Sequence, residues 1–162
     1  MKFVESYKQI DLFGKTALII SSGFGTGLIP KAPGTFASLA TVPLVIGLSY
    51  LSPALQILSL AIFIAVAIGL SDISEKSLKR QDPPEIVIDE AAGILITCFL
   101  LPVTWVMLIS GFLLFRFFDI LKPYPIKKTE KISGGMGIVL DDLLAGVYAH
   151  LCLRLFLYFM MM

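Results

Sequence analysis

The stretch "IVIDEAAGILIT", residues 86–97, decides the fold of this chain. Two adjacent carboxylates, Asp89 and Glu90, open an apolar run that has no charged residue from Ala91 to Phe115. Neighbouring carboxylates repel each other and hold water, so their place at the entrance to an apolar region requires a compensating interaction. The stretch therefore predicts a helix that enters an apolar environment and a polar site at its beginning.

Length and composition indicate a single domain, residues 1–162, in a membrane. The chain is 57% hydrophobic and 15% charged, whereas a soluble domain carries about 25% charged residues. A net charge of +1 argues against a nucleic-acid partner, and no feature indicates an obligate protein partner. The N-terminal stretch "MKFVESYKQIDLFGK", residues 1–15, mixes acids with bases and lacks the apolar core of a cleaved signal peptide. We expect residues 1–22 to form a cytoplasmic or interfacial segment.

The apolar runs predict an all-α integral membrane bundle of about five transmembrane helices. One helix needs about 20 apolar residues to cross a bilayer. Breaks are expected at the turn Ser52-Pro53 and at Pro102. The predicted helices are roughly 35–51, 54–70, 86–101, 103–121 and 143–162.

Charge placement favours five spans over four. With five, the turns near 52 and 102 lie on one side and carry no charge. The N-terminal segment and the loops 71–90 and 116–142 lie on the other side and hold 24 of the 25 charged residues. These loops contain lysines and are therefore expected in the cytoplasm. The exception, Arg154, could reach the outer interface or pair inside the bundle, and His150 is expected to be a packed or hydrogen-bonded core residue.

Paired acids gather at the charged side. Asp141 and Asp142 begin the last predicted span much as Asp89 and Glu90 begin the third, and Asp119 lies nearby. Acids at helix N-termini also have a structural explanation, as caps or as partners of the helix dipole. Carboxylate oxygens at this density suit Mg²⁺. The predicted metal ligands are Asp89, Glu90, Asp141 and Asp142.

Basic residues on the same side could bind phosphate. In "FRFFDILKPYPIKK", residues 115–128, Arg116, Asp119 and Lys122 share one helical face. They could form a ladder of ion pairs, or the two cations could bind a phosphate ester. In "GFGTGLIPKAPGT", residues 23–35, Thr35 could cap the first span, or the loop could approach a phosphate with Lys31 and Thr35 close to it.

Four stretches together resemble the phosphatidylglycerophosphatase A family, in the family's order from about residue 20 to the C-terminus. They are "GFGTGLIPKAPGTFASL", "DPPEIVIDEAAG", "FRFFDILKPYPI" and "GGMGIVLDDLLAG". The resemblance implies a Mg²⁺-dependent phosphatase of the bacterial inner membrane. Such an enzyme removes the terminal phosphate of phosphatidylglycerophosphate and leaves phosphatidylglycerol. The family motif positions are Asp89, Glu90, Arg116, Asp119, Lys122, Asp141 and Asp142, with Lys31 weighted less and the role of Asp82 left open.

The expected mechanism is metal-assisted hydrolysis at the cytoplasmic face. The carboxylates assigned to catalysis are Asp89, Glu90, Asp119, Asp141 and Asp142, and the phosphate ligands are Arg116, Lys122, Lys31 and Thr35. Water is the simplest nucleophile, and attack by a carboxylate is an alternative. Two other classes compete with the enzyme: a small cation transporter or channel subunit that uses the border acids, and a lipid-binding scaffold. Ionisable residues gathered on one side count against a transport route.

Overall fold

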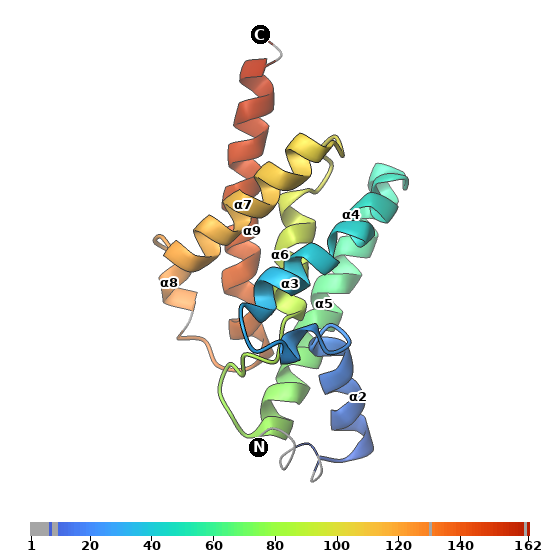
Figure 1. Cartoon of the computed structure of the whole chain (residues 1–162), viewed down its shortest axis with the longest axis vertical. Helices are drawn as coiled ribbons and strands as arrows, with labels where there is room; N and C mark the ends of the chain where they lie inside the picture. Colours follow the sequence, from blue (N-terminus) through green and yellow to red (C-terminus); the bar gives the residue numbers. More distant parts are fainter. Residues whose placement is uncertain (1–6, 8–9, 130, 161) are drawn as a thin grey trace.

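The computed structural model describes residues 7, 10–129, 131–160 and 162; the predicted N-terminal segment falls outside it at residues 1–6 and 8–9. Within the described residues the chain is helical and contains no strand, which confirms the all-α prediction. Figure 1 shows the order of the elements. These are α2 Leu12–Ser21, the 3₁₀ turn η1 Thr26–Leu28, α3 Pro33–Ala40, α4 Val42–Ser49, α5 Pro53–Leu78, α6 Ile88–Thr97, α7 Trp105–Leu121, α8 Ile126–Thr129 and α9 Gly135–Met160.

The short helix α6 forms the centre of the bundle. It contacts α9, α5, α7 and α3, and it runs beside the lower half of α9 (Figure 1). Buried apolar side chains on these helices make the core, with Ile94 on α6, Phe115 on α7 and Ala145 and Ala149 on α9. The helices around α6 thus hold its charged first turn at one end of the molecule.

Helices α5 and α9 have the length and composition of membrane spans. Each has 26 residues, about 39 Å at 1.5 Å per residue. Only 11% and 22% of their most apolar windows are buried inside the protein. The core helix of a soluble protein would be mostly buried, so these exposed apolar surfaces are suited to lipid. The other predicted spans correspond to shorter helices, α6 with 10 residues and α7 with 17.

The first predicted span, 35–51, is two helices in the structure. Helices α3 and α4 meet at Thr41, and Pro43 stands in the first turn of α4. Proline has no N–H to donate, so it interrupts the hydrogen bonding of a continuous helix. The expected N-cap at Thr35 is wrong, because α3 begins at Pro33 after Ala32, whose φ is 53°.

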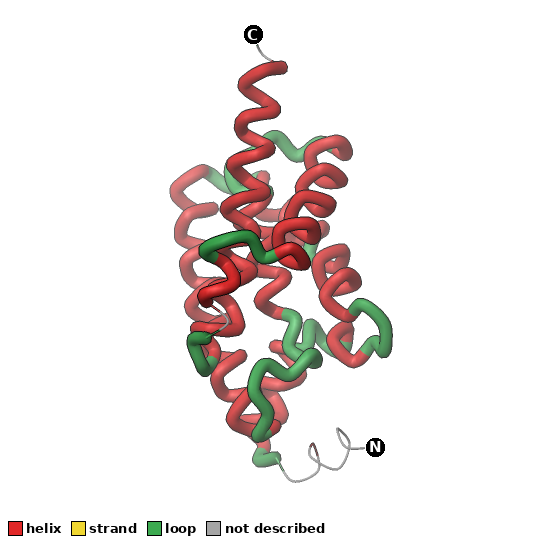
Figure 2. Tube along the Cα trace, turned by 90° about the vertical axis from the view of Figure 1, so that its left-hand side faces the viewer, coloured by secondary structure: helices red, strands yellow, loops and turns green. Residues whose placement is uncertain are grey.

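Two long helices extend eight residues beyond the ranges expected from hydropathy. Helix α5 continues to Leu78 rather than 70, and α9 begins at Gly135 rather than 143. Helix α2 packs along the added part of α5, where the hydroxyls of Ser21 and Ser74 lie 2.8 Å apart. The charged residues therefore mark a change of environment and not the end of a helix. Figure 2 shows several loops between the helices in the lower half of the molecule.

Candidate active site

Three carboxylates from two helices meet at the charged end of the bundle. Asp89 and Glu90 belong to the first turn of α6, and Asp142 belongs to α9. One oxygen from each lies within 4.8 Å of the others. Asp89 and Asp142 are only 9% and 4% exposed. We call these three residues the acid triad.

Glycines allow the two helices of the acid triad to lie against each other. A Cβ on Gly146 of α9 would collide with the backbone oxygen of Gly93 on α6. A Cβ on Gly93 would collide with the Phe115 ring and come within 3.0 Å of the Asp142 carbonyl oxygen. Close backbone approach at these positions places Asp142 opposite the N-terminal turn of α6.

Two oxygens of the acid triad are buried without a hydrogen-bond partner in the described part of the chain. They are Oδ1 of Asp89 and Oε2 of Glu90. A buried, unsatisfied polar atom costs roughly 1 to 3 kcal/mol, and more when it is charged. The dipole at the start of α6 offsets part of this cost. A bound cation would offset the rest of this free-energy cost.

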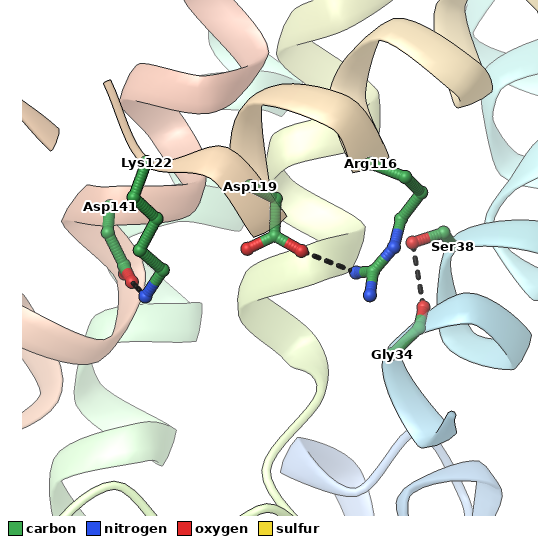
Figure 3. A network of polar contacts seen from close by, with 6 residues as sticks. All are labelled: Gly34, Ser38, Arg116, Asp119, Lys122 and Asp141. Atoms are coloured by element: carbon green, nitrogen blue, oxygen red, sulfur yellow. Dashed lines mark hydrogen bonds and ion pairs between the residues drawn. The ribbon is translucent and has the colours of Figure 1, made fainter. Parts of the chain in front are cut away.

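Arg116 stands beside the acid triad. Its Nη1 lies 2.7 Å from Oδ2 of Asp119, one turn further along α7, and both side chains are mostly buried. Its Nε has no hydrogen-bond partner among the described residues. The other wall is the first turn of α3, where a Cβ on Gly34 would meet both the Glu90 carboxylate and the Arg116 guanidinium. Figure 3 shows Arg116 reaching towards Gly34 and Ser38.

Lys122 and Asp141 form a separate pair. The Lys122 Nζ donates to Oδ2 of Asp141 at 2.7 Å. Lys122 is the C-cap of α7 with φ 44°, and this left-handed turn lies where the side chain leaves the face of Arg116 and crosses to α9. The structure therefore places Asp141 with Lys122 and Asp142 with the acid triad, although the two aspartates are adjacent.

All seven family motif positions line one cavity of about 290 Å³. Among the other lining residues are Ala32 and Gly34 at the start of α3, and Asp82, Pro84 and Ile86 in the loop before α6. Lys31 and Thr35 do not line it; Lys31 is exposed, and the chain reaches the cavity through the backbone between them. Sequence reasoning missed Gly34, for which the short residues of "APGT" were the available signal.

Acidic and basic side chains in one cavity, at the end of apolar helices, are the combination with which enzymes that act on phosphate esters bind metal ions and phosphoryl oxygens. The chain matches the model of the family described as phosphatidylglycerophosphatase A over residues 19–157. It belongs to that family and is therefore an enzyme of the phosphatase class, which confirms the resemblance found in the motifs.

Relatives support this membership over nearly the whole chain. Phosphatidylglycerophosphatase A of Haemophilus influenzae is 38% identical over 157 residues, 95% of this chain and 96% of the relative. The Escherichia coli protein of the same name is 38% identical over 133 residues, 80% of this chain and 76% of the relative. A Bacteroides thetaiotaomicron protein, 35% identical over 142 residues (83% and 89%), is named provisionally as a phosphatidylinositol-3-phosphatase. No solved structure matches the chain.

Proposed function

We propose that this enzyme hydrolyses the terminal phosphate of phosphatidylglycerophosphate to give phosphatidylglycerol, with Mg²⁺ as cofactor. The observation that carries the proposal is the acid triad in the same cavity as Arg116, with two buried oxygens that have no hydrogen-bond partner in the part of the chain that the structure describes. The names of the two 38% identical relatives support the choice of substrate.

The residues of the acid triad fit a divalent cation. Carboxylate oxygens are the hard ligands that Mg²⁺ prefers, and three of them converge within 4.8 Å. We assign Asp89, Glu90 and Asp142 as the ligands. Asp141 was also expected among them, but its carboxylate accepts a hydrogen bond from Lys122, so we assign it to positioning that lysine.

Each remaining charged group has a role in transferring the phosphoryl group to water. When bound, Mg²⁺ would polarise the phosphoryl oxygens and make a water easier to deprotonate. Arg116 presents Nε and its second amino group to the phosphate while Asp119 holds Nη1. We assign Asp119 to take the proton of the attacking water. The new P–O bond forms as the P–O bond to the terminal glycerol oxygen breaks. The proton that Asp119 has taken passes to this oxygen, so phosphatidylglycerol leaves as the alcohol and inorganic phosphate is released.

We further propose that the enzyme crosses the bacterial inner membrane about five times, with the cavity facing the cytoplasm. Helices α5 and α9 support a membrane location. The consecutive helices α3 and α4 (Pro33–Ser49) and helix α7 each cover 17 residues, about 26 Å at 1.5 Å per residue. The turns near 52 and 102 lie together at the end of the bundle opposite the acid triad (Figure 1).

Phosphate release from defined lipids tests the function. Purified enzyme in mixed micelles should release phosphate from phosphatidylglycerophosphate when Mg²⁺ is present and lose this activity after chelation. Phosphatidylinositol 3-phosphate is the comparison lipid, because one relative bears the name of a phosphatase for it. Preference for the inositol lipid would overturn the assigned substrate, and full activity in chelator would overturn the assigned cofactor.

Thermal unfolding gives a readout that does not depend on turnover. Removal of Mg²⁺ should lower the Tm of the wild type, because the carboxylates of the acid triad then repel without a counter-ion. In Asp142→Asn one charge of the acid triad is gone, so the response of Tm to Mg²⁺ should shrink. An equal response in both proteins would contradict metal binding at the acid triad.

A further inference from the structure

One stripe of α9 follows the whole length of α6. Asp142, Gly146, His150 and Arg154 are spaced four residues apart and therefore lie on neighbouring turns of the same side. Asp142 belongs to the acid triad, and Gly146 touches the backbone of α6 at Gly93. The last two members have no place in the proposed chemistry, because they lie at the opposite end of α6.

His150 binds the last residue of α6, and Arg154 binds the turn that follows it. The carbonyl oxygen of Thr97 lies 3.2 Å from His150 Nδ1, and that of Leu100 accepts from Arg154 Nη2 at 3.2 Å. Arg154 Nε also donates to His150 Nε2 at 3.3 Å. A carbonyl can only accept, so the proton of the neutral imidazole is on Nδ1, which leaves Nε2 to accept from the arginine. The two side chains therefore act as one unit.

This unit provides hydrogen-bond donors for carbonyl groups at and just after the end of the short helix α6. The last carbonyls of a helix have no partner within the helix, and α6 ends at Thr97, after ten residues, in apolar surroundings. Such surroundings offer no water to bind the free carbonyls. A cation at a helix C-terminus also interacts favourably with the helix dipole. Arg154 thus has a specific polar partner although it lies in an apolar run.

The middle of the α6–α9 contact is formed by glycines and has few interlocking side chains. Gly93 and Gly146 bring the backbones together, and Thr97 Oγ1 lies 2.8 Å from the carbonyl oxygen of Gly93 and 3.5 Å from that of Gly146. Glycines carry no side chains that could interlock, so this contact fixes the separation of the helices better than their relative rotation or sliding. Directional hydrogen bonds at the far end supply that restraint.

We propose that His150 and Arg154 are positioning residues that lock α6 in register with α9 and so hold Asp89 and Glu90 opposite Asp142. The lock lies eight residues from Asp89, about 12 Å along the helix. A rotation of α6 released at Thr97 would carry the two carboxylates away from Asp142. The consequence for metal affinity rests on the proposed function, whereas the consequence for the helices does not.

Hydrogen exchange and the Mg²⁺ dependence of activity together test whether the contacts of His150 and Arg154 hold α6 in register with α9. Arg154→Met removes the donors and keeps an apolar, flexible side chain; Arg154→Lys keeps a cation and one contact. Leu155→Ala is the matched control, because Leu155 is the exposed neighbour on the same helix. In metal-free Arg154→Met, the amides of 97–101 and also those of 88–93 should exchange faster. The Mg²⁺ concentration for half-maximal phosphate release should rise about tenfold, as for other residues that orient metal ligands.

The outcomes separate this proposal from the function on which part of it rests. Arg154→Lys should lie between the wild type and Arg154→Met, and Leu155→Ala should match the wild type. Faster exchange confined to 97–101, with an unchanged Mg²⁺ requirement, means a local cap and overturns the lock. A wild type that needs no Mg²⁺ rejects the metal function. Faster exchange at 88–93 would still support the lock in that case, and unchanged exchange there would overturn it.

Discussion

Replacing Arg116 by lysine should lower kcat/KM far more than conservation of charge would suggest. The guanidinium is mostly buried, with Nη1 2.7 Å from the Asp119 carboxylate and with no hydrogen-bond partner for Nε among the described residues. A planar fork of this kind can hold a carboxylate and a phosphate oxygen at the same time, whereas an ammonium is a point charge on a flexible stem. A lysine at this position can therefore bind Asp119 or the substrate phosphate, but it cannot hold both in the geometry of the guanidinium.

The structure sets the size of the effect. If one charge-assisted hydrogen bond to the phosphate is lost, the cost is about 1.5 to 3 kcal/mol, which corresponds to a reduction of kcat/KM by roughly 10- to 150-fold. Arg80→Lys is the matched control. Arg80 makes its ion pair with Glu85 at the surface, is 44% exposed and does not line the cavity.

Initial rates of phosphate release over a range of lipid concentrations measure the effect. Circular dichroism and the Tm of both variants should match the wild type, so that a difference in rate reports the site and not the amount of folded enzyme. If Arg116→Lys and Arg80→Lys both keep kcat/KM within twofold of the wild type, Arg116 does not contact the phosphate. Its pair with Asp119 would then be structural.

Other residues give further tests. Asp89→Asn should reduce kcat by orders of magnitude, and excess Mg²⁺ should restore part of it if the lost group is a ligand and not a proton acceptor. Lys122→Ala should mainly raise KM, measured in the same lipid assay, because we expect its charge to bind the substrate phosphate and to take no part in proton transfer. Gly146→Ala should weaken Mg²⁺ binding measured by calorimetry, because the new methyl group pushes α9 away from α6. Single cysteines at Ser52 and Lys79 should be labelled from opposite sides of the membrane in intact cells, and labelling from one side contradicts the five-span topology.

The convergence of the charged residues could be predicted from the sequence because of simple geometry. If the chain crosses an apolar layer repeatedly, alternate connections return to the same side. The acid pairs at 89–90 and 141–142 therefore had to lie at one end of the bundle with Arg116 and Lys122. The structure brings all of these side chains to one cavity. Their approximate depth followed from the apolar runs alone.

The different partners of Asp141 and Asp142 could not be predicted in this way. Successive residues on a helix point about 100° apart, so one aspartate of the pair can face α6 while the other faces Lys122. Which one does so depends on the rotation of α9, which in the structure turns Gly146 towards Gly93 and Asp142 towards Asp89 and Glu90. The direction of Lys122 depends on its left-handed φ of 44° at the end of α7. Neither quantity is visible in a hydropathy pattern.

The ends of the helices also could not be predicted from the positions of the charged residues. The sequence predicts that the spans end at charged residues, yet α5 continues through Asp72 and Lys76, which pair with each other at 2.6 Å. A helix satisfies its own backbone hydrogen bonds in water as well as in lipid, so nothing obliges it to stop at the interface. The extension of α5 provides the surface on which α2 packs.

The depth of the cavity suits a substrate that never leaves the bilayer. On α7, apolar side chains such as Leu113 and Phe117 are exposed on the outside of the bundle, while Arg116 and Asp119 turn inward at the last turns of the same helix. The outside of α7 stays apolar beside these charged residues, with Ile120 and Leu121 exposed at the end of the helix. A phospholipid whose acyl chains remain among the exposed apolar side chains carries its phosphates at that level. We infer that the lengths of the apolar helices set the height of the catalytic groups, so that the enzyme needs to extract only the headgroup from its surroundings.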